Sequence, residues 1–310
     1  MPVPLIEQRV LGPRIVSLLP SATEIVCALG LQAHLVGVSH ECDFPLGVEK
    51  LPRVTRTAIP KGLDSQAIDS TVRALLQTQA ALYHLNEEVL AELKPELIVT
   101  QALCDVCAVS AEEVNTVACR LPGQPKVINL EPMSLAEVFA TITLLGAVTQ
   151  RQQQADRVLQ LLQGRVDAVT SRTATIPAVQ RPRVAMLEWI DPLFNAGHWT
   201  PELVTMAGGI DCLGNANQPS RRIEAKDLID ANPEVIFIAL CGFDMARTAE
   251  DLPLLKKIPG WDSLSCVQQG RVYYTDGNAY FSRPGPRLVD SLEILAHTLH
   301  PELHPGLNPN

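Results

Sequence analysis

Residues 14–30 read RIVSLLPSATEIVCALG, which is the pattern of a buried strand followed by a helix. The apolar run at 14–19 predicts the strand, and residues 23–29 predict a helix that ends at Gly30. A strand that leads at once into a helix is the first half of a βαβ unit, and such units build parallel sheets. The opening stretch therefore predicts an α/β fold.

The same alternation of strands and helices continues on both sides of a central helical region. Three further strands are predicted in the first half of the chain, at 35–39, 97–101 and 126–130. Three more are predicted in the second half, at 183–188, 235–240 and 271–275. We therefore expect two Rossmann-like lobes with parallel sheets, at residues 1–133 and 177–310, and a ligand cleft between them.

A long helical pattern separates the two predicted lobes. Ser134 and Glu137 form a capping box, and apolar residues then recur at helical spacing without a proline until Pro177. Roughly 38 residues at 1.5 Å per residue would span on the order of 57 Å, which exceeds the size of one small lobe. We expect a single helix at residues 134–176 that bridges the lobes.

The composition indicates a large folded core and argues against several classes of partner. The chain has 310 residues, of which 46% are hydrophobic, and its 34 acidic and 25 basic residues give a net charge of −9. A negative protein lacks the positive charge on which affinity for nucleic acid and anionic membrane depends. No window approaches the roughly 18 uninterrupted apolar residues of a membrane span. We expect no nucleic-acid partner and no membrane insertion.

The N-terminal segment and the cysteines bear on the compartment. Residues 1–14 contain neither a basic segment nor a continuous apolar segment of signal-peptide length. Eight cysteines are too few for a secreted scaffold held by disulfides, so a reducing compartment is the simpler interpretation. We expect a cytoplasmic protein as the chain is written, or a periplasmic one if a leader was removed.

Chemically distinctive residues follow the predicted strands. The carboxyl ends of parallel strands open onto a crevice, and helix N-termini point into it. Aromatic side chains there could wall a flat ligand while polar side chains orient it, although some aromatics could instead pack the lobe interior. The predicted ligand contacts are Ser21, Thr23, Glu41, Glu188, Trp189, His198, Trp199, Phe243, Asp244, Tyr280 and Arg283.

One histidine and three cysteines of the first lobe form a candidate metal site. His40-x-Cys42 and Cys104-x-x-Cys107 both follow predicted strands. One imidazole with three thiolates is a suitable set for zinc or an iron–sulfur cluster, and Cys241 of the second lobe could complete it. A redox-active Cys-x-x-Cys pair and inert buried thiols are alternatives that the sequence leaves open.

The common catalytic and nucleotide-binding motifs are missing from the sequence. There is no G-x-G-x-x-G after a strand, no phosphate-binding P-loop, no G-x-S-x-G and no H-E-x-x-H. We therefore expect a protein that binds a small ligand without catalysis.

Several stretches resemble the cobalamin-binding solute receptors of ABC importers, and in particular the leaderless branch of that group. They are residues 14–24, LVGVS at 35–39, Asp43-Phe-Pro45, LKPELIV at 93–99 and Pro192-Leu-Phe. The resemblance runs from Arg14 to about His300 and implies two α/β lobes joined by one long helix. It also implies a corrinoid or similar tetrapyrrole held between rather rigid lobes.

Three features depart from the importer receptors that the chain resembles. Those receptors carry one docking glutamate on each lobe, and the matching positions here are Glu88 and Lys226, so one charge is reversed. The stretch in which they place a stacking tryptophan reads Ser-Arg-Arg-Ile at 220–223. The Cys-x-x-Cys replaces a loop without cysteines. Docking on an ABC permease is therefore in doubt.

Two functional hypotheses follow. In the first, the protein binds a corrinoid or similar tetrapyrrole, with Trp189, Trp199 and Tyr280 against its face. His40 or His198 is then an axial ligand, since neutral imidazole suits cobalt or iron. In the second, a cytosolic protein with the receptor fold binds zinc or an iron–sulfur cluster, or acts in redox chemistry, through the four candidate metal ligands named above.

Overall fold

The computed structural model describes residues 12–78, 81–101, 109 and 111–305. Contacts divide the chain into two compact units, which we call the first and second lobes. The first lobe comprises residues 1–58, 81–131 and 143–155. The second comprises residues 59–80, 132–142 and 156–310, so an early segment of the chain belongs to the second lobe.

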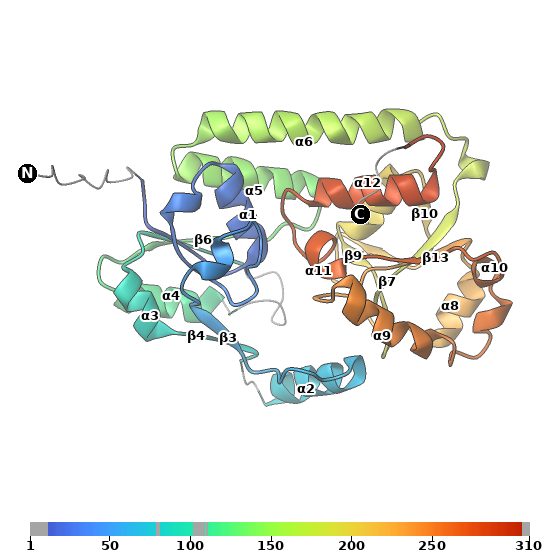
Figure 1. Cartoon of the computed structure of the whole chain (residues 1–310), viewed down its shortest axis with the longest axis horizontal. Helices are drawn as coiled ribbons and strands as arrows, with labels where there is room; N and C mark the ends of the chain where they lie inside the picture. The colour runs from blue at the N-terminus through green and yellow to red at the C-terminus, as the bar shows by residue number, and fades with distance from the viewer. Residues whose placement is uncertain (1–11, 79–80, 102–108, 110, 306–310) are drawn as a thin grey trace, which may run out of the picture. The chain divides into compact units, whose positions relative to one another are not determined.

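The first lobe is built on a parallel sheet of four strands in the order β2-β1-β5-β6 (Figure 1). Strand β1 (Ile15–Ser17) lies between β2 (Leu35–Val38) and β5 (Leu97–Thr100), and β6 (Lys126–Asn129) pairs with β5. Every residue of β1 and β5 is buried, as expected for apolar strands covered on both faces. The helices of this lobe are α1 (Pro20–Ala28), α3 (Glu87–Leu93) and α4 (Ala111–Arg120).

The second lobe has a parallel sheet in the order β10-β7-β12-β13 (Figure 1). Its strands are β7 (Arg183–Trp189), β10 (Ile210–Asp211), β12 (Val235–Ile238) and β13 (Val272–Tyr274), with β8 (Phe194–Asn195) antiparallel to β7. Strands β9 (Gly197–His198) and β11 (Asn215–Ala216) form a separate pair. The helices that follow β7 along the chain are α7 (Thr200–Met206), α8 (Ala225–Ala231), α9 (Met245–Leu255), α10 (Ser265–Gln268), α11 (Gly277–Tyr280) and α12 (Leu288–Leu299).

The predicted fold class is confirmed, and each predicted strand ends within two residues of an observed one. The reason is that the buried strands are continuous apolar runs, which stand out from the amphipathic helices beside them. Short single-turn 3₁₀ helices complete the chain at Gln32–His34, Val48–Lys50, Ala178–Gln180 and Trp261–Ser263.

The predicted helix at 134–176 is wrong in its extent, because the structure has two helices there. Helix α5 (Leu135–Val148) ends before Thr149, and α6 (Gln152–Thr173) begins three residues later. Gln150 has a φ of 57°, the left-handed conformation that stops a helix. The predicted start is correct, since the Ser134 hydroxyl accepts a hydrogen bond from the Glu137 N–H at 3.3 Å.

The break could not be predicted from the sequence, because residues 149–151 between the two helices include neither proline nor glycine. A β-carbon on Gly146 of α5 would lie 2.6 Å from that of Ala155 on α6, so the two helices touch next to the turn. Helix α6 is the long helix of the fold, with 22 residues and a length of about 33 Å.

Helix α2 (Ser65–Gln77) lies between the two strands of a hairpin that was not predicted from the sequence. Strands β3 (Thr55–Thr57) and β4 (Tyr83–Leu85) pair antiparallel in the first lobe, and the Ala58 N–H donates to the Leu82 carbonyl at 2.8 Å. The residues between them, 59–80, belong to the second lobe. These strands read Thr-Arg-Thr and Tyr-His-Leu, so they lack the continuous apolar run by which the other strands were predicted.

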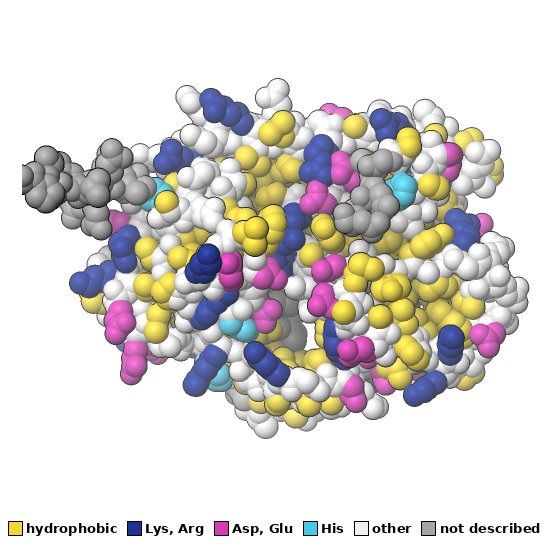
Figure 2. All heavy atoms as spheres, viewed as in Figure 1, with side chains coloured by type: hydrophobic (Ala, Val, Ile, Leu, Met, Phe, Trp, Pro, Cys, Tyr) yellow, Lys and Arg dark blue, Asp and Glu magenta, His cyan; other side chains and the backbone are white. Residues whose placement is uncertain are grey.

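The described surface carries mixed charge. Figure 2 shows acidic and basic side chains interspersed over the face that it draws, rather than gathered into one basic patch. Of the helices in the described ranges, none combines the length and the apolar character needed to cross a membrane.

Candidate functional site

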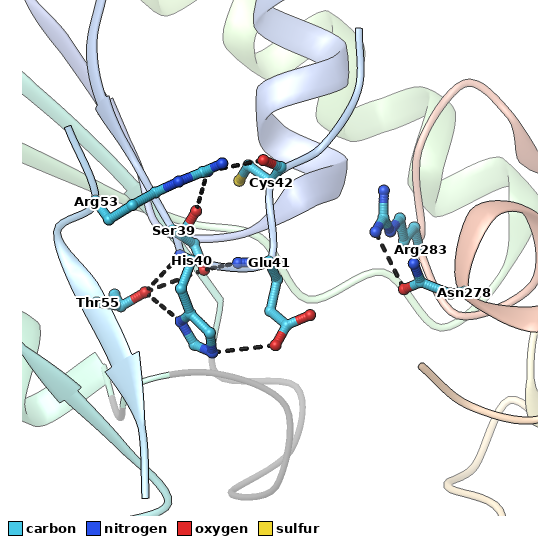
Figure 3. A network of polar contacts seen from close by, with 8 residues as sticks. All are labelled: Ser39, His40, Glu41, Cys42, Arg53, Thr55, Asn278 and Arg283. Atoms are coloured by element: carbon cyan, nitrogen blue, oxygen red, sulfur yellow. Dashed lines mark hydrogen bonds and ion pairs between the residues drawn. The ribbon is translucent and has the colours of Figure 1, made fainter. Parts of the chain in front are cut away.

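His40 of the first lobe is held by a threonine on the neighbouring hairpin (Figure 3). Strand β2 ends at Val38, and the chain then turns through His40 towards Cys42. The Thr55 hydroxyl lies 3.0 Å from the backbone nitrogen of His40 and 2.7 Å from its ring Nδ1. It also donates to the Ser39 hydroxyl at 3.1 Å. The backbone and the ring of His40 are therefore both fixed by β3.

The same contacts determine where the proton of His40 lies. The Thr55 hydroxyl gives its single hydrogen to Ser39, so Nδ1 must donate to it and carries a hydrogen. Nε2 then faces the carboxylate of Glu41, whose Oε1 lies 3.0 Å away. This second contact is attractive only when the ring is also protonated at Nε2. In the neutral ring, Nε2 is the nitrogen with a lone pair to give.

An arginine fixes the loop that carries His40. One nitrogen of Arg53 donates to the carbonyls of Ser39 and Cys42, at 2.8 and 2.7 Å. The loop borders a small hollow of the first lobe, in which the ring centroids of His40 and Tyr83 lie 5.4 Å apart. The hollow is lined by Leu18, Pro20, Ser39, His40, Glu41, Thr55, Tyr83 and Val109.

Two predicted ligand contacts of this lobe lie inside it. Ser21 and Thr23 are 2% and 0% exposed, in the first turn of α1. The Thr23 hydroxyl lies 2.8 Å from that of Ser17 and 3.1 Å from the Cys42 sulfur. These two residues therefore pack the lobe interior in the structure, whereas Glu41, at about half exposure, faces solvent.

The candidate metal site is only partly within the described residues. Cys104 and Cys107 lie outside them. Cys42 is fully buried, and the exposed Cys241 belongs to the second lobe. Among the described side chains, no group of three or more His, Cys, Asp and Glu is placed to hold a metal ion. The zinc, cluster and redox interpretations therefore gain no support.

Trp189 and Phe243 of the second lobe, both predicted ligand contacts, form an aromatic pair. Trp189 is the last residue of β7 and Phe243 lies beyond the end of β12, and their ring centroids lie 4.9 Å apart. The guanidinium of Arg247 lies 4.2 Å from the centroid of the Phe243 ring, and it pairs with Asp251 at 3.0 Å. Asp244 instead caps α9, accepting from the Arg247 N–H at 2.7 Å. A cation over one ring of a pair is a surface suited to flat, acidic ligands.

Glu188 lies at the end of β7 among hydrogen-bond donors. Its Oε1 accepts from the Gly197 N–H at 3.1 Å. Burial raises the pKa of Glu188 from an ordinary 4.5 to about 7, although hydrogen bonds from Gly197, Ser220 and Thr200 act in the opposite direction. Burial likewise raises the pKa of neighbouring Asp211. The second lobe thus holds two carboxyl groups whose pKa values burial raises.

His198 and Trp199 follow Glu188 on the β9 segment. His198 has a φ of 52°, and burial lowers its pKa, so its ring is held neutral. Trp199 is 5% exposed and donates its Nε1–H to the Phe281 carbonyl at 3.0 Å. In the structure Trp199 therefore packs the interior of the lobe, which was the alternative to its predicted contact with a ligand.

The two remaining candidates lie near α11. Arg283 is 4% exposed and donates to Asn278 Oδ1 at 3.0 Å (Figure 3). Tyr280 is half-buried, with the Arg287 guanidinium 5.9 Å from its ring centroid. Tyr280 remains suited to a ligand contact, whereas Arg283 is part of the loop's internal structure.

The sequence does not mark the residues that hold the site side chains in place, chiefly Arg53, Thr55 and Arg247. Each acts through a partner far along the chain or on another element, as Thr55 does with His40 across 15 residues. No motif marks such residues. The one available signal was that Thr55 and Arg53 stand just beyond the Asp43-Phe-Pro45 motif, in a stretch without a predicted element.

Comparisons with known proteins identify the family. The family described as "Periplasmic binding protein" has a sequence model that matches residues 15–279. The chain belongs to the periplasmic binding protein family. Members of this family are binding proteins rather than enzymes, in agreement with the expected lack of catalysis.

Three relatives illustrate the membership. An uncharacterized ABC transporter substrate-binding lipoprotein of Bacillus subtilis is 23% identical over 93% of this chain and 80% of its own length. The vitamin B12-binding protein of Vibrio cholerae is 22% identical, and its crystal structure superposes with a TM-score of 0.68 over 93% of this chain and 96% of that one. A periplasmic heme-binding protein of Roseiflexus sp. RS-1 is 22% identical with a TM-score of 0.67, over 94% and 99% of the two chains. At these identities the superpositions establish the fold alone.

The family membership also bears on location and partners. Periplasmic binding proteins named above include a lipoprotein and proteins titled periplasmic, so the expected cytoplasmic location finds no support. The predicted docking positions are both at the surface of their own lobes. Glu88 is exposed in the first turn of α3, and Lys226 is exposed on α8, 2.6 Å from Asp230.

Proposed function

We propose that this periplasmic binding protein is a receptor for a metal-centred tetrapyrrole, either cobalamin or heme, and that it serves an ABC transporter. The observation that carries the proposal is the geometry of His40. Thr55 holds its Nδ1 as a hydrogen-bond donor, which leaves Nε2 as the nitrogen with a lone pair for cobalt or iron. Relatives named for vitamin B12 and for heme support this class of ligand.

In this proposal Glu41 guards the metal-binding atom. Nε2 of His40 is covered in the ligand-free protein and makes no hydrogen bond within the described part of the chain, with Glu41 as its neighbour at 3.0 Å. The carboxylate of Glu41 is about half-exposed, and in this proposal it turns away from Nε2 when the ligand binds. The metal then takes the place of Glu41.

Titration with hemin and with hydroxocobalamin tests the proposal. We expect micromolar or tighter binding of one of them, followed by a shift of its visible absorbance bands to those of a histidine-ligated metal. His40→Ala should weaken binding by about tenfold or more, because a coordination bond is lost, and should abolish the shifted spectrum. His84→Ala on β4 is the matched control and should leave affinity and spectrum unchanged.

Two results would contradict the proposal. Absence of binding by both ligands at micromolar protein would exclude the ligand class. A His40→Ala variant that binds with the original affinity and spectrum would exclude His40 as the ligand to the metal. Transport by a permease is a separate claim. The second lobe carries Lys226 at the position where the importer receptors carry a docking glutamate, so we expect no docking through that position.

A further inference from the structure

Residues 59–78, which we call the α2 arm, are attached to the second lobe by few contacts. The arm leaves and re-enters the first lobe at the β3–β4 hairpin but belongs to the second lobe by its contacts. Of the residues of α2, only Ser65 is buried. The side chain of Ile68 packs against the core of the second lobe, but the last turns of the helix are largely exposed. A helix of this length with so little buried surface is held weakly.

The polar contacts of the α2 arm are long and incomplete. The Trp189 Nε1–H is shared between the Asp191 carbonyl at 3.0 Å and the Ser65 carbonyl of the arm at 3.3 Å, and Arg247 donates to the Leu63 carbonyl at 3.5 Å. The Ser65 hydroxyl is buried and has no hydrogen-bond partner in the described part of the chain. Each buried polar atom without a partner lowers the stability of the attachment. The contact therefore has the character of an interface that opens.

The arm occupies the surface that would suit a ligand. Its first turn lies on Trp189, which pairs with Phe243, and on Arg247, whose guanidinium lies over the Phe243 ring. Trp189 is the last residue of β7, and Phe243 and Arg247 lie beyond the end of β12, at the sheet edge where parallel sheets bind ligands. The backbone carbonyls of Leu63 and Ser65 thus take hydrogen bonds that an acidic ligand would otherwise accept.

We propose that the α2 arm is a displaceable cap, and that a planar aromatic ligand with acidic side groups replaces it on the second lobe. The ring system of the ligand stacks on Trp189 and Phe243, and a carboxylate takes the Arg247 hydrogen bond from the Leu63 carbonyl. A charge-assisted bond is stronger than the neutral one that it replaces. This inference rests on the proposed function for the ligand, but the weak attachment of the arm does not.

Amide hydrogen exchange of the ligand-free protein tests the attachment. We expect peptides from residues 66–76 to exchange about 100-fold faster than peptides from β12, because the arm opens without unfolding the lobe. Arg247→Met keeps the apolar contact and removes the hydrogen bond to Leu63 together with the ion pair to Asp251, so it should speed exchange in the arm by about fivefold more than it speeds exchange in β12. Arg157→Met on the exposed side of α6 is the control. Slow exchange of the arm, or no response to Arg247→Met, would overturn the cap.

The same measurement with hemin tests the displacement. If hemin replaces the arm, exchange at residues 63–68 should rise on binding, while exchange at Trp189 and in the loop after β12 should fall. Protection of residues 63–68 by bound hemin would overturn displacement and make the arm part of the wall. If hemin fails to bind at all, the proposed function fails for heme, and the ligand-free exchange alone decides whether the arm is a cap.

Discussion

Replacing Glu188 with glutamine is expected to stabilise the protein at pH 8 and to leave its stability nearly unchanged at pH 4.5. The carboxyl group has a pKa of about 7 in the folded protein, against an ordinary 4.5, with burial as the largest cause. The folded state therefore binds the proton more tightly than the unfolded state does. The contribution of Glu188 to stability is full below pH 4.5 and is lost as the pH rises to about 7.

The size of the effect follows from the same pKa difference. One pKa unit corresponds to about 1.4 kcal/mol, so the full difference corresponds to about 3 kcal/mol. Glu188 keeps some contact with solvent, which reduces the expected gain at pH 8 to about 2 kcal/mol. Glutamine is neutral at every pH, and its amide oxygen can still accept the hydrogen bond from Gly197.

Urea unfolding of both proteins at pH 4.5 and pH 8 measures this prediction. The difference in free energy of unfolding between variant and wild type should grow with pH. Glu92→Gln, an exposed substitution on α3, should give a difference that does not depend on pH in this way. An equal difference for Glu188→Gln at both pH values would show that its carboxyl group is not tuned by burial.

Gly277→Ala is expected to destabilise the second lobe by about 3 kcal/mol. Gly277 opens α11 directly against the end of β12, where a β-carbon would lie 2.6 Å from the Ala239 carbonyl carbon and closer still to the Leu240 carbonyl oxygen. Both atoms belong to the backbone of the central sheet, so no side chain can move aside. The loop that carries Tyr280 must shift instead.

Gly164→Ala is the matched control for this substitution. Gly164 lies inside α6, and a β-carbon there would meet no atom within 4 Å. Alanine favours the helix, so this variant should be more stable than wild type by about 0.5–1 kcal/mol. Thermal unfolding of both variants gives the comparison. A Gly277→Ala variant as stable as wild type would mean that the α11 loop is free to move away from β12.

The two glycine sites illustrate why the sequence predicts helices and strands better than it predicts the contacts of individual residues. The sequence does not show that Gly277 lies against the end of β12 while Gly164 lies in open space. The same holds for Thr23 and Glu41, both predicted as ligand contacts. Thr23 faces Ser17 and Cys42 inside the lobe, whereas Glu41 faces solvent beside His40. Position after a strand indicates the edge of the sheet but not the direction of each side chain.

By itself, the sequence determined the α/β class, the strands and the placement of His40 and Trp189 at their carboxyl ends. These features are local, because an apolar run and its neighbouring helix contain their own periodicity. Tertiary structure alone decided that the central helix breaks at Gln150, that the α2 arm joins the second lobe, and that Trp199 packs inside. Each of these depends on contacts between residues far apart in the chain, for which a single sequence carries no periodic signal.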